Sequence, residues 1–263
     1  MYSSIIQTLA VAIGFAACSV DAVALRRSTK KLTQGTTWTL EAWGYDDTSK
    51  GDMIDIDLQT SSKDYVEKLS DGGQYVVCYI SAGTAEDWRG DFLDMMNFAA
   101  RDSRYPGEYW MNITRWQEFK HLIKARIEEA ADKGCHGIEP DNTDAYEYGS
   151  MAITGESRES LRQYQIDYIR WMAKTAHALG LQIGLKNTVD LIPDLIDNMD
   201  FAINESCAKY SENDYCSNYD AFVKQDKAVF GVEYSTKGSC TDAMSEGIMR
   251  KYKNMNSNKW VDC

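Results

Sequence analysis

Short apolar segments alternate along this chain with longer segments of helical periodicity. The helical pattern is clearest in Arg115–Lys133 and Arg158–Leu179, where apolar residues recur every three or four positions. Each stretch is followed by a glycine, Gly134 or Gly180, as is common at helix C-termini, and then by an apolar, β-rich segment. This order predicts βαβ units, in which helices cover a parallel sheet.

Eight segments have the composition of strands. They are Trp38–Trp43, Met53–Leu58, Tyr75–Ile80, Gly137–Asp141, Leu181–Lys186, Phe201–Glu205, Ala228–Tyr234 and, as the weakest pattern, Lys259–Val261. Eight strands in 263 residues predict an α/β fold, a single (β/α)8 TIM barrel, because this barrel typically takes about 250 residues. The first third of the barrel is ambiguous, since Tyr109–Ile113 can replace Trp38–Trp43 as a strand.

The N-terminus has the pattern of a secretory signal peptide. Its apolar run, Ile5–Ala17, is too short to span a bilayer, and Ala22–Ala24 resembles a cleavage site. We therefore expect cleavage of residues 1–24 and a secreted, extracellular domain over residues 25–263, with no membrane contact after cleavage. An uncleaved anchor is the alternative, because no Lys or Arg precedes the apolar run.

Six cysteines remain after the expected cleavage, and an even number in a secreted chain favours disulfides. Pairing neighbours along the sequence predicts Cys207–Cys216 and Cys240–Cys263, which leaves Cys78 and Cys135 at the ends of two predicted strands. A zinc site is disfavoured, because the chain has no Cys-x-x-Cys pair and its three histidines are scattered.

The composition is that of an acidic globular protein. Hydrophobic residues make up 44% of the chain, and 28 basic residues stand against 40 acidic ones, for a net charge of −12. This apolar content disfavours disorder, and the negative charge argues against a nucleic-acid partner and favours a cationic or neutral ligand. We expect a monomer.

Ionisable residues gather at the C-terminal ends of the predicted strands, where TIM barrels place their active sites. They are Asp55, Asp57, Glu139, Asp141, Asp144, Lys186, Glu205 and Glu233. A single acid at a strand end is more often a helix cap or a surface charge, but repetition on successive strands indicates a site. Two carboxyl groups with separated pKa values can cleave a glycosidic bond, and Lys186 would keep one of them ionised.

Four segments carry a resemblance to a known family: Cys78–Gly83, Gly134–Asp144, Gly184–Asn187 and Phe201–Cys207. Over about Trp38–Tyr234 the chain resembles glycoside hydrolase family 114, the endo-α-1,4-polygalactosaminidases. The resemblance implies a secreted TIM-barrel enzyme that cuts partly deacetylated galactosamine polymers with retention of configuration. It also implies that Asp141 is the nucleophile and Glu205 the acid/base. From the residues alone, the two roles can be exchanged, or Glu233 can replace Glu205.

The remaining polar and aromatic residues at the strand ends are expected to bind the substrate. These are Asp57, Tyr79, Glu139, Asn142, Asp144, Lys186, Glu233 and Tyr234. The acidic ones would attract the ammonium groups of a cationic galactosamine polymer, and the tyrosines would stack on sugar faces. No metal or other cofactor is expected, because the acids lack the ordered spacing of a calcium loop.

Two other functions fit the same residues. An exo-acting α-galactosidase would use the same carboxylate chemistry, and a non-catalytic carbohydrate-binding barrel would hold a cationic glycan without cutting it. Loss of turnover with retained binding in Asp141→Asn would separate an enzyme from a binding module.

Overall fold

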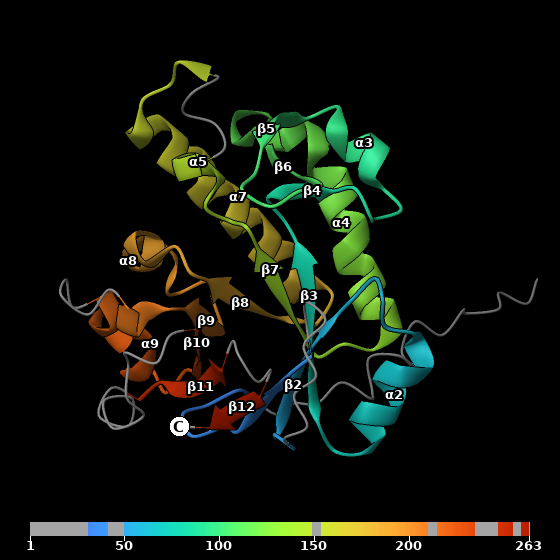
Figure 1. Cartoon of the computed structure of the whole chain (residues 1–263), viewed down its shortest axis with the longest axis vertical. Helices are drawn as coiled ribbons and strands as arrows, with labels where there is room; N and C mark the ends of the chain where they lie inside the picture. The colour runs from blue at the N-terminus through green and yellow to red at the C-terminus, as the bar shows by residue number, and fades with distance from the viewer. Residues whose placement is uncertain are drawn as a thin grey trace, which may run out of the picture.

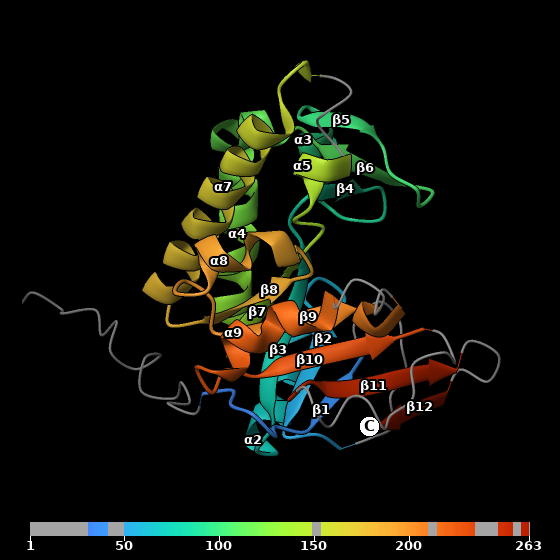
Figure 2. The same ribbon diagram turned by 90° about the vertical axis from the view of Figure 1, so that its left-hand side faces the viewer.

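Eight parallel strands follow one another around a nearly closed barrel (Figures 1 and 2). They are β1 (Trp38–Leu40), β2 (Met53–Asp57), β3 (Tyr75–Ser81), β7 (Gly137–Asp141), β8 (Gln182–Lys186), β9 (Phe201–Glu205), β10 (Val229–Glu233) and β11 (Met249–Asn254). The structure is a computed structural model and describes residues 31–41, 50–148, 154–209, 215–234, 247–254 and 259–262. Between the first and last parallel strands, the indole N–H of Trp38 donates to the carbonyl of Met249 at 3.0 Å.

The predicted single-domain (β/α)8 barrel is confirmed, and seven of its eight strands were predicted within a few residues. The eighth prediction was wrong: β12 (Lys259–Asp262) pairs antiparallel with β11, and β11 is the strand that runs parallel to β10. The sequence of β11, Met-Arg-Lys-Tyr-Lys-Asn, hides it, because Arg250 and Lys251 are charged and yet buried. A strand of this composition shows no apolar alternation.

Three longer helices cover the outside of the first half of the barrel: α2 (Lys63–Asp71), α4 (Trp116–Lys133) and α7 (Arg158–Ala178). The predicted helices at residues 115–133 and 158–179 are confirmed to within one residue. Gly134 ends α4 with φ of 93°, the left-handed conformation that glycine adopts without strain. Shorter helical segments follow strands elsewhere: η2 (Ile113–Arg115), α5 (Ala145–Tyr148), η3 (Val189–Leu191), α8 (Ile192–Leu195), η5 (Tyr215–Tyr219) and α9 (Asp220–Val223).

A small antiparallel sheet interrupts the alternation between β3 and β7. It consists of β4 (Thr84–Glu86), β6 (Glu108–Met111) and β5 (Ala99–Asp102), in that spatial order, with α3 (Phe92–Met96) beside it. The ambiguity in the sequence is thereby resolved, because residues 109–111 do form a strand, but in this sheet and in addition to β1. The sheet lies beyond the carboxyl ends of β3 and β7, where an active site is expected (Figure 1).

Apolar side chains fill two separate layers. One layer lies between the barrel and its helices, where Trp116 of α4 packs against Tyr168 of α7 with ring centroids 5.8 Å apart. The other fills the barrel interior, where Trp38 packs against Phe230 at 5.1 Å. Burying such rings stabilises the fold by about 1.5–3 kcal/mol each.

Two disulfides are present in the described residues. The predicted Cys207–Cys216 bond is confirmed, and Cys78 of β3 is bonded to Cys135, which precedes β7. Bonds of this kind stabilise a domain by about 2–4 kcal/mol, largely by restricting the unfolded chain. Cys240, Cys263 and the predicted signal peptide, residues 1–24, lie outside the described residues. Within those residues, no helix is long and apolar enough to cross a bilayer.

Candidate active site

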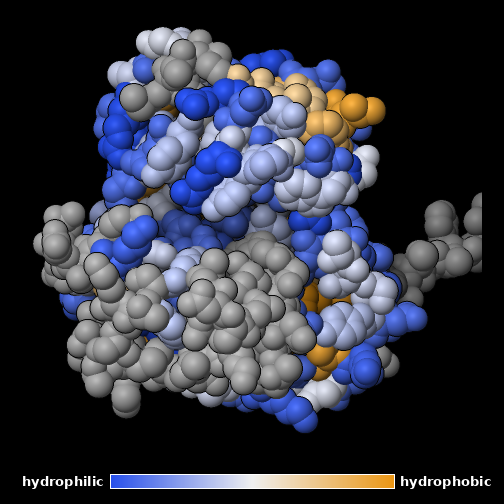
Figure 3. Space-filling model, viewed as in Figure 1, coloured by the Kyte–Doolittle hydropathy of each residue, from blue (hydrophilic) through white to orange (hydrophobic). Residues whose placement is uncertain are grey.

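An open cleft of about 1430 Å³ lies between the barrel rim and the antiparallel sheet. Figure 3 shows it as a hydrophilic hollow across the middle of the molecule. Its floor comes from residues at the carboxyl ends of β2, β3, β7, β8 and β9. Its opposite wall comes from β5, β6 and the turn between them, together with Trp88 after β4 and Tyr148 of α5. The cleft is therefore built from two different parts of the fold.

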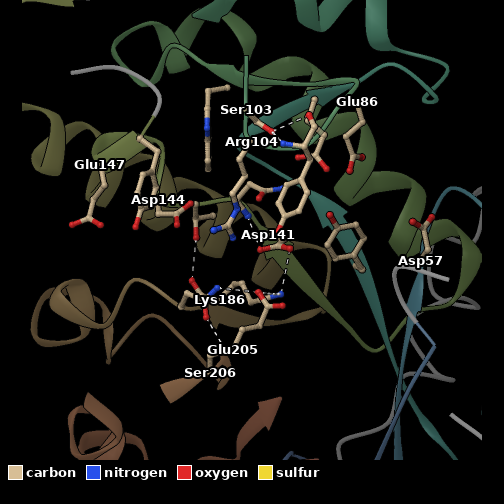
Figure 4. A pocket seen from close by; sticks show the side chains of 18 of the residues that line it. Asp57, Glu86, Ser103, Arg104, Asp141, Asp144, Glu147, Lys186, Glu205 and Ser206 are labelled. Carbon is tan, nitrogen blue, oxygen red and sulfur yellow. Dashed lines mark hydrogen bonds and ion pairs between the residues drawn. The ribbon is translucent and has the colours of Figure 1, made fainter. Parts of the chain in front are cut away.

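The ammonium group of Lys186, at the end of β8, is the centre of the floor. Its Nζ lies 2.7 Å from Glu139 Oε1, 3.3 Å from Asp141 Oδ2 and 3.6 Å from Glu205 Oε2 (Figure 4). The lysine side chain is 1% exposed. Burial alone would lower the pKa of Lys186, but the surrounding carboxylates, led by Asp141, outweigh burial and raise it. Lys186 is therefore a permanent buried cation that holds three carboxylates together.

Asp141 and Glu205 are the two carboxylates on this lysine that also face the cleft. Their side chains are 15% and 27% exposed. Burial raises the pKa of Asp141, Lys186 opposes this, and the charge of Glu205 adds to the rise. Burial acts in the same direction on Glu205, but the Lys186 charge and a hydrogen bond from Tyr234 lower its pKa. The environment thus separates the pKa values of the pair, as acid–base catalysis by two carboxyls requires.

The Glu205 carboxylate is held from both sides. The hydroxyl of Tyr234 donates to Oε1 at 2.6 Å, and the amide of Asn187 donates to Oε2 at 3.3 Å. The backbone N–H of Glu205 in turn donates to the side-chain oxygen of Asn187 at 2.9 Å. Neighbouring strand ends therefore orient Glu205.

The residues that follow the three charged strand ends adopt unusual backbone conformations. Asn142, Asn187, Thr188 and Ser206 have φ of 59°, 50°, 43° and 64°. Such conformations are costly for residues other than glycine and cluster at functional sites. Asn142 also approaches Gly83 so closely that a Cβ at Gly83 would lie 1.6 Å from the Asn142 carbonyl oxygen. Gly83 therefore permits the turn that follows Asp141.

Asp57 lines the cleft but is already paired. Arg89 donates to both of its oxygens, at 2.8 and 2.6 Å, and also donates to Glu86 at 2.6 Å. Burial opposes ionisation of Asp57, but Arg89 outweighs burial and lowers its pKa. Arg89, which we did not predict from the sequence, thus joins the barrel floor to the end of β4.

The other predicted binding residues divide into two groups. Tyr79, Asn142, Asp144, Lys186 and Tyr234 line the cleft. Glu139 is fully buried beneath it. Glu233 is 5% exposed, and its carboxylate accepts a hydrogen bond from the backbone N–H of Ala208 at 2.9 Å. The lining residues do not include Glu139 or Glu233.

The wall contributes residues that the sequence did not single out for binding. Trp88, Tyr105 and Tyr148 are 54%, 52% and 55% exposed, and the Tyr148 ring stacks on Trp110 at 6.0 Å. All four aromatic side chains line the cleft. Exposed aromatic faces of this kind suit the apolar faces of sugar rings.

Two acids on the wall side have strongly raised pKa values. Burial, reinforced by Glu86 and Asp141, raises the pKa of Glu108 to about 7. Burial and the charge of Asp141 likewise raise the pKa of Asp144 to about 7. The guanidinium of Arg104 reaches toward Asp141 from the turn between β5 and β6 (Figure 4) and partly counteracts both shifts. Among the described residues, no cluster of three or more His, Cys, Asp or Glu is arranged to hold a metal ion.

Comparison with known proteins agrees with this fold. The structure is similar to that of Aspergillus fumigatus Ega3 in complex with galactosamine: the TM-score is 0.77 with 32% identity, and the match covers 90% of this chain and 98% of that one. The glycoside hydrolase domain of PelA from Pseudomonas aeruginosa has the same fold, with a TM-score of 0.65, 16% identity and coverage of 86% and 97%.

A sequence relative covers less of the chain. An uncharacterized protein of Thermotoga maritima is 24% identical over 119 residues, which make up 43% of this chain and 36% of that protein. Residues 20–263 match the model of glycoside-hydrolase family GH114. The resemblance carried by the strand-end segments is thereby confirmed, and the chain belongs to glycoside hydrolase family GH114.

Proposed function

We propose that this glycosidase is secreted and cleaves within α-1,4-linked, galactosamine-containing polysaccharide. The observation that carries the proposal is the position of Asp141 and Glu205, which share the Lys186 ammonium at the floor of an open, acid-lined cleft. The likeness to Ega3, which was crystallised with galactosamine, supports the sugar. The disulfides support secretion, since such bonds persist in oxidising compartments.

In the proposed mechanism, Asp141 attacks the anomeric carbon and Glu205 protonates the leaving oxygen. Glu205 then removes a proton from the water that releases the sugar. Both carboxylates lie within 3.6 Å of the Lys186 ammonium, which limits the distance between them. They are therefore closer together than the carboxyls of most inverting enzymes, which are about 6.5–9.5 Å apart. This spacing supports a retaining reaction.

The pKa values in the substrate-free site favour a second candidate mechanism, in which Glu205 is the nucleophile and Asp141 is the acid/base. The raised pKa of Asp141 and the lowered pKa of Glu205 are opposite to what a nucleophile and an acid need. With Asp141 as nucleophile, substrate binding must move the proton. A sugar ammonium beside Asp141 would favour its ionised form, and loss of the Tyr234 hydrogen bond would raise the pKa of Glu205. A slowly hydrolysed fluorosugar, followed by peptide mass mapping, identifies the carboxyl that forms the covalent bond.

The charge of the cleft favours a cationic polymer. Five basic residues line it against nine acids, which are Asp141, Glu205 and seven others: Glu41, Asp57, Glu86, Asp102, Glu108, Asp144 and Glu147. Their field attracts ammonium groups and offers nothing to a neutral galactan. An open cleft of this size suits cleavage inside a chain, and we propose that the protein acts as a monomer.

The deciding experiment is product analysis by mass spectrometry with two substrates, partly deacetylated α-1,4-galactosaminogalactan and a neutral α-galactoside. Galactosamine-rich oligomers that are absent with Asp141→Asn are the expected result. Release of galactose alone would replace the proposal with the exo-acting α-galactosidase. Binding of the polymer without any product from either substrate would indicate a non-catalytic carbohydrate-binding barrel.

A further inference from the structure

Asp55, on β2, is a buried carboxyl that the proposed mechanism does not use. Its side chain is 0% exposed, inside the barrel and beneath the cleft. Neither of its oxygens accepts a hydrogen bond from a donor group in the described part of the chain. An isolated carboxylate in such surroundings is strongly disfavoured, so the site favours the neutral, protonated form.

The partner of Asp55 is another buried carboxyl. Asp55 and Glu139 lie close enough inside the barrel for the charge of Glu139 to raise the pKa of the Asp55 carboxyl. Glu139 is also 0% exposed; its Oε1 accepts from Lys186 at 2.7 Å, while its Oε2 has no donor among the described N–H and O–H groups. Two carboxylates repel each other, and a hydrogen bond between them exists only if one holds a proton.

We propose that Asp55 is a positioning residue that holds one proton and donates it in a hydrogen bond to Glu139. Glu139 then presents its other oxygen, as a single negative charge, to Lys186. Lys186 in turn stays between Asp141 and Glu205, the pair assigned to catalysis in the proposed function, on which this inference rests. If Asp55 lost its proton, a second buried negative charge would repel Glu139 and draw Lys186 away from the cleft.

The charged groups around Asp55 agree with this arrangement. Glu139 and Asp141 face it from β7, and Lys186 faces it from β8. The residues paired with it on β1 and β3, Leu40 and Val77, are apolar, and the titratable side chains on the same face of β3 are Tyr75 and Tyr79. Burial is the main cause of the raised pKa of Asp55, followed by the charge of Glu139.

The first test compares two substitutions of Asp55. In Asp55→Asn the amide N–H replaces the O–H donor and does not titrate, so we expect kcat at neutral pH within about threefold of the wild type. The alkaline limb of the kcat profile should move upward by about one pH unit or more. Asp55→Ala removes the donor and should lower kcat at least about tenfold with little change in KM.

A matched control shows whether the effect is only structural. Asp91 is another acid with a defined partner, Arg126 of α4, at 2.7 Å, and it is not among the residues that line the cleft. Asp91→Asn should lower the Tm and leave the pH profile unchanged. If Asp55→Asn behaves like Asp91→Asn, or loses as much activity as Asp55→Ala, the proposal is wrong.

A second measurement does not depend on hydrolysis. Infrared spectra of wild type and Asp55→Asn at about pH 8, where carboxyls with ordinary pKa values are ionised, should differ by the carbonyl band of one protonated carboxyl. That band should remain in Asp141→Asn. Its absence from the wild type would overturn the shared proton even in an active enzyme. If the band is present in a protein that cleaves no substrate, the proposed function is wrong, but the proton shared by Asp55 and Glu139 is supported.

Discussion

The floor and the wall of the cleft are built in opposite ways. On the floor, the strand ends β7, β8 and β9 carry buried charges whose partners lie within 3.6 Å, as around Lys186. On the wall, the turn after β4 and the turn between β5 and β6 present half-exposed rings, Trp88 and Tyr105. The floor offers charges in fixed positions for bond cleavage, and the wall offers surface and charge for holding a polymer.

This difference indicates that catalysis and substrate selection can be changed separately. Floor substitutions should lower kcat, because they alter groups that touch the reacting atoms. Wall substitutions should raise KM and leave kcat, because they alter binding that is equal in ground and transition states.

The largest effect is expected for the two carboxyls on the floor. Asp141→Asn and Glu205→Gln keep the size of each side chain and remove its charge and proton transfer, so kcat should fall on the order of 10³-fold. Unchanged polymer binding, measured by calorimetry, would show that only the chemistry is lost. Loss of both binding and turnover in equal measure would mean that the floor also selects the substrate.

A large effect on both stability and activity is expected for Lys186→Met. Removal of the cation leaves Glu139, Asp141 and Glu205 close together without their common partner. The free energy of unfolding should fall by about 3–5 kcal/mol, as for other broken buried ion pairs. The loss should be greatest between about pH 7 and 10, where the carboxyls are ionised and lysine is charged in both the folded and the unfolded state. It should be smaller in acid, where the carboxyls take up protons, and urea unfolding at several pH values measures it. A pH-independent loss would contradict the account of the floor.

The floor was largely predictable from sequence, and the wall was not. Asp141, Lys186 and Glu205 end apolar strands, so the regular barrel pattern itself brings them together. Glu108 and Arg104 belong to an insertion whose position over the barrel depends on tertiary packing and not on a repeating pattern. The sequence also could not show which of the strand acids face the cleft. Glu139 and Glu233 lie in or at the end of a strand in the same way as Asp141, and yet they do not line the cleft.

A moderate, pH-dependent effect is expected for Glu108 on the wall. Its pKa of about 7 means that it gains its negative charge only as the pH rises through neutrality. The affinity of the wild type for the cationic polymer should therefore increase between about pH 6 and 8. Glu108→Gln should lose this increase while its kcat stays unchanged, as KM measured across this range would show.

The raised pKa of Glu108 also affects the stability of the folded protein. Because the folded-state pKa is raised above 4.5, the folded protein binds more protons than the unfolded chain up to about pH 7, so ionisation of Glu108 costs stability as the pH rises. Glu108→Gln should gain on the order of 1 kcal/mol over the wild type above pH 7, after allowance for solvent screening. Glu118→Gln, on the exposed surface of α4, is the control and should show neither effect.

The smallest effect is expected for the aromatic part of the wall. Tyr148 lines the cleft, is half-exposed and stacks on Trp110, so its ring is supported by another ring and accessible to substrate. Tyr148→Ala should raise KM for long oligomers by about three- to tenfold, since a stacking contact contributes about 0.5–1.5 kcal/mol. KM for the shortest cleavable oligomer should change less, because that substrate need not reach the wall. Leu93→Ala, at an exposed site on α3 that does not line the cleft, controls for loss of surface area. A fall in kcat with the short substrate would show instead that the wall orients the reacting sugar, and the separation of floor and wall would then be wrong.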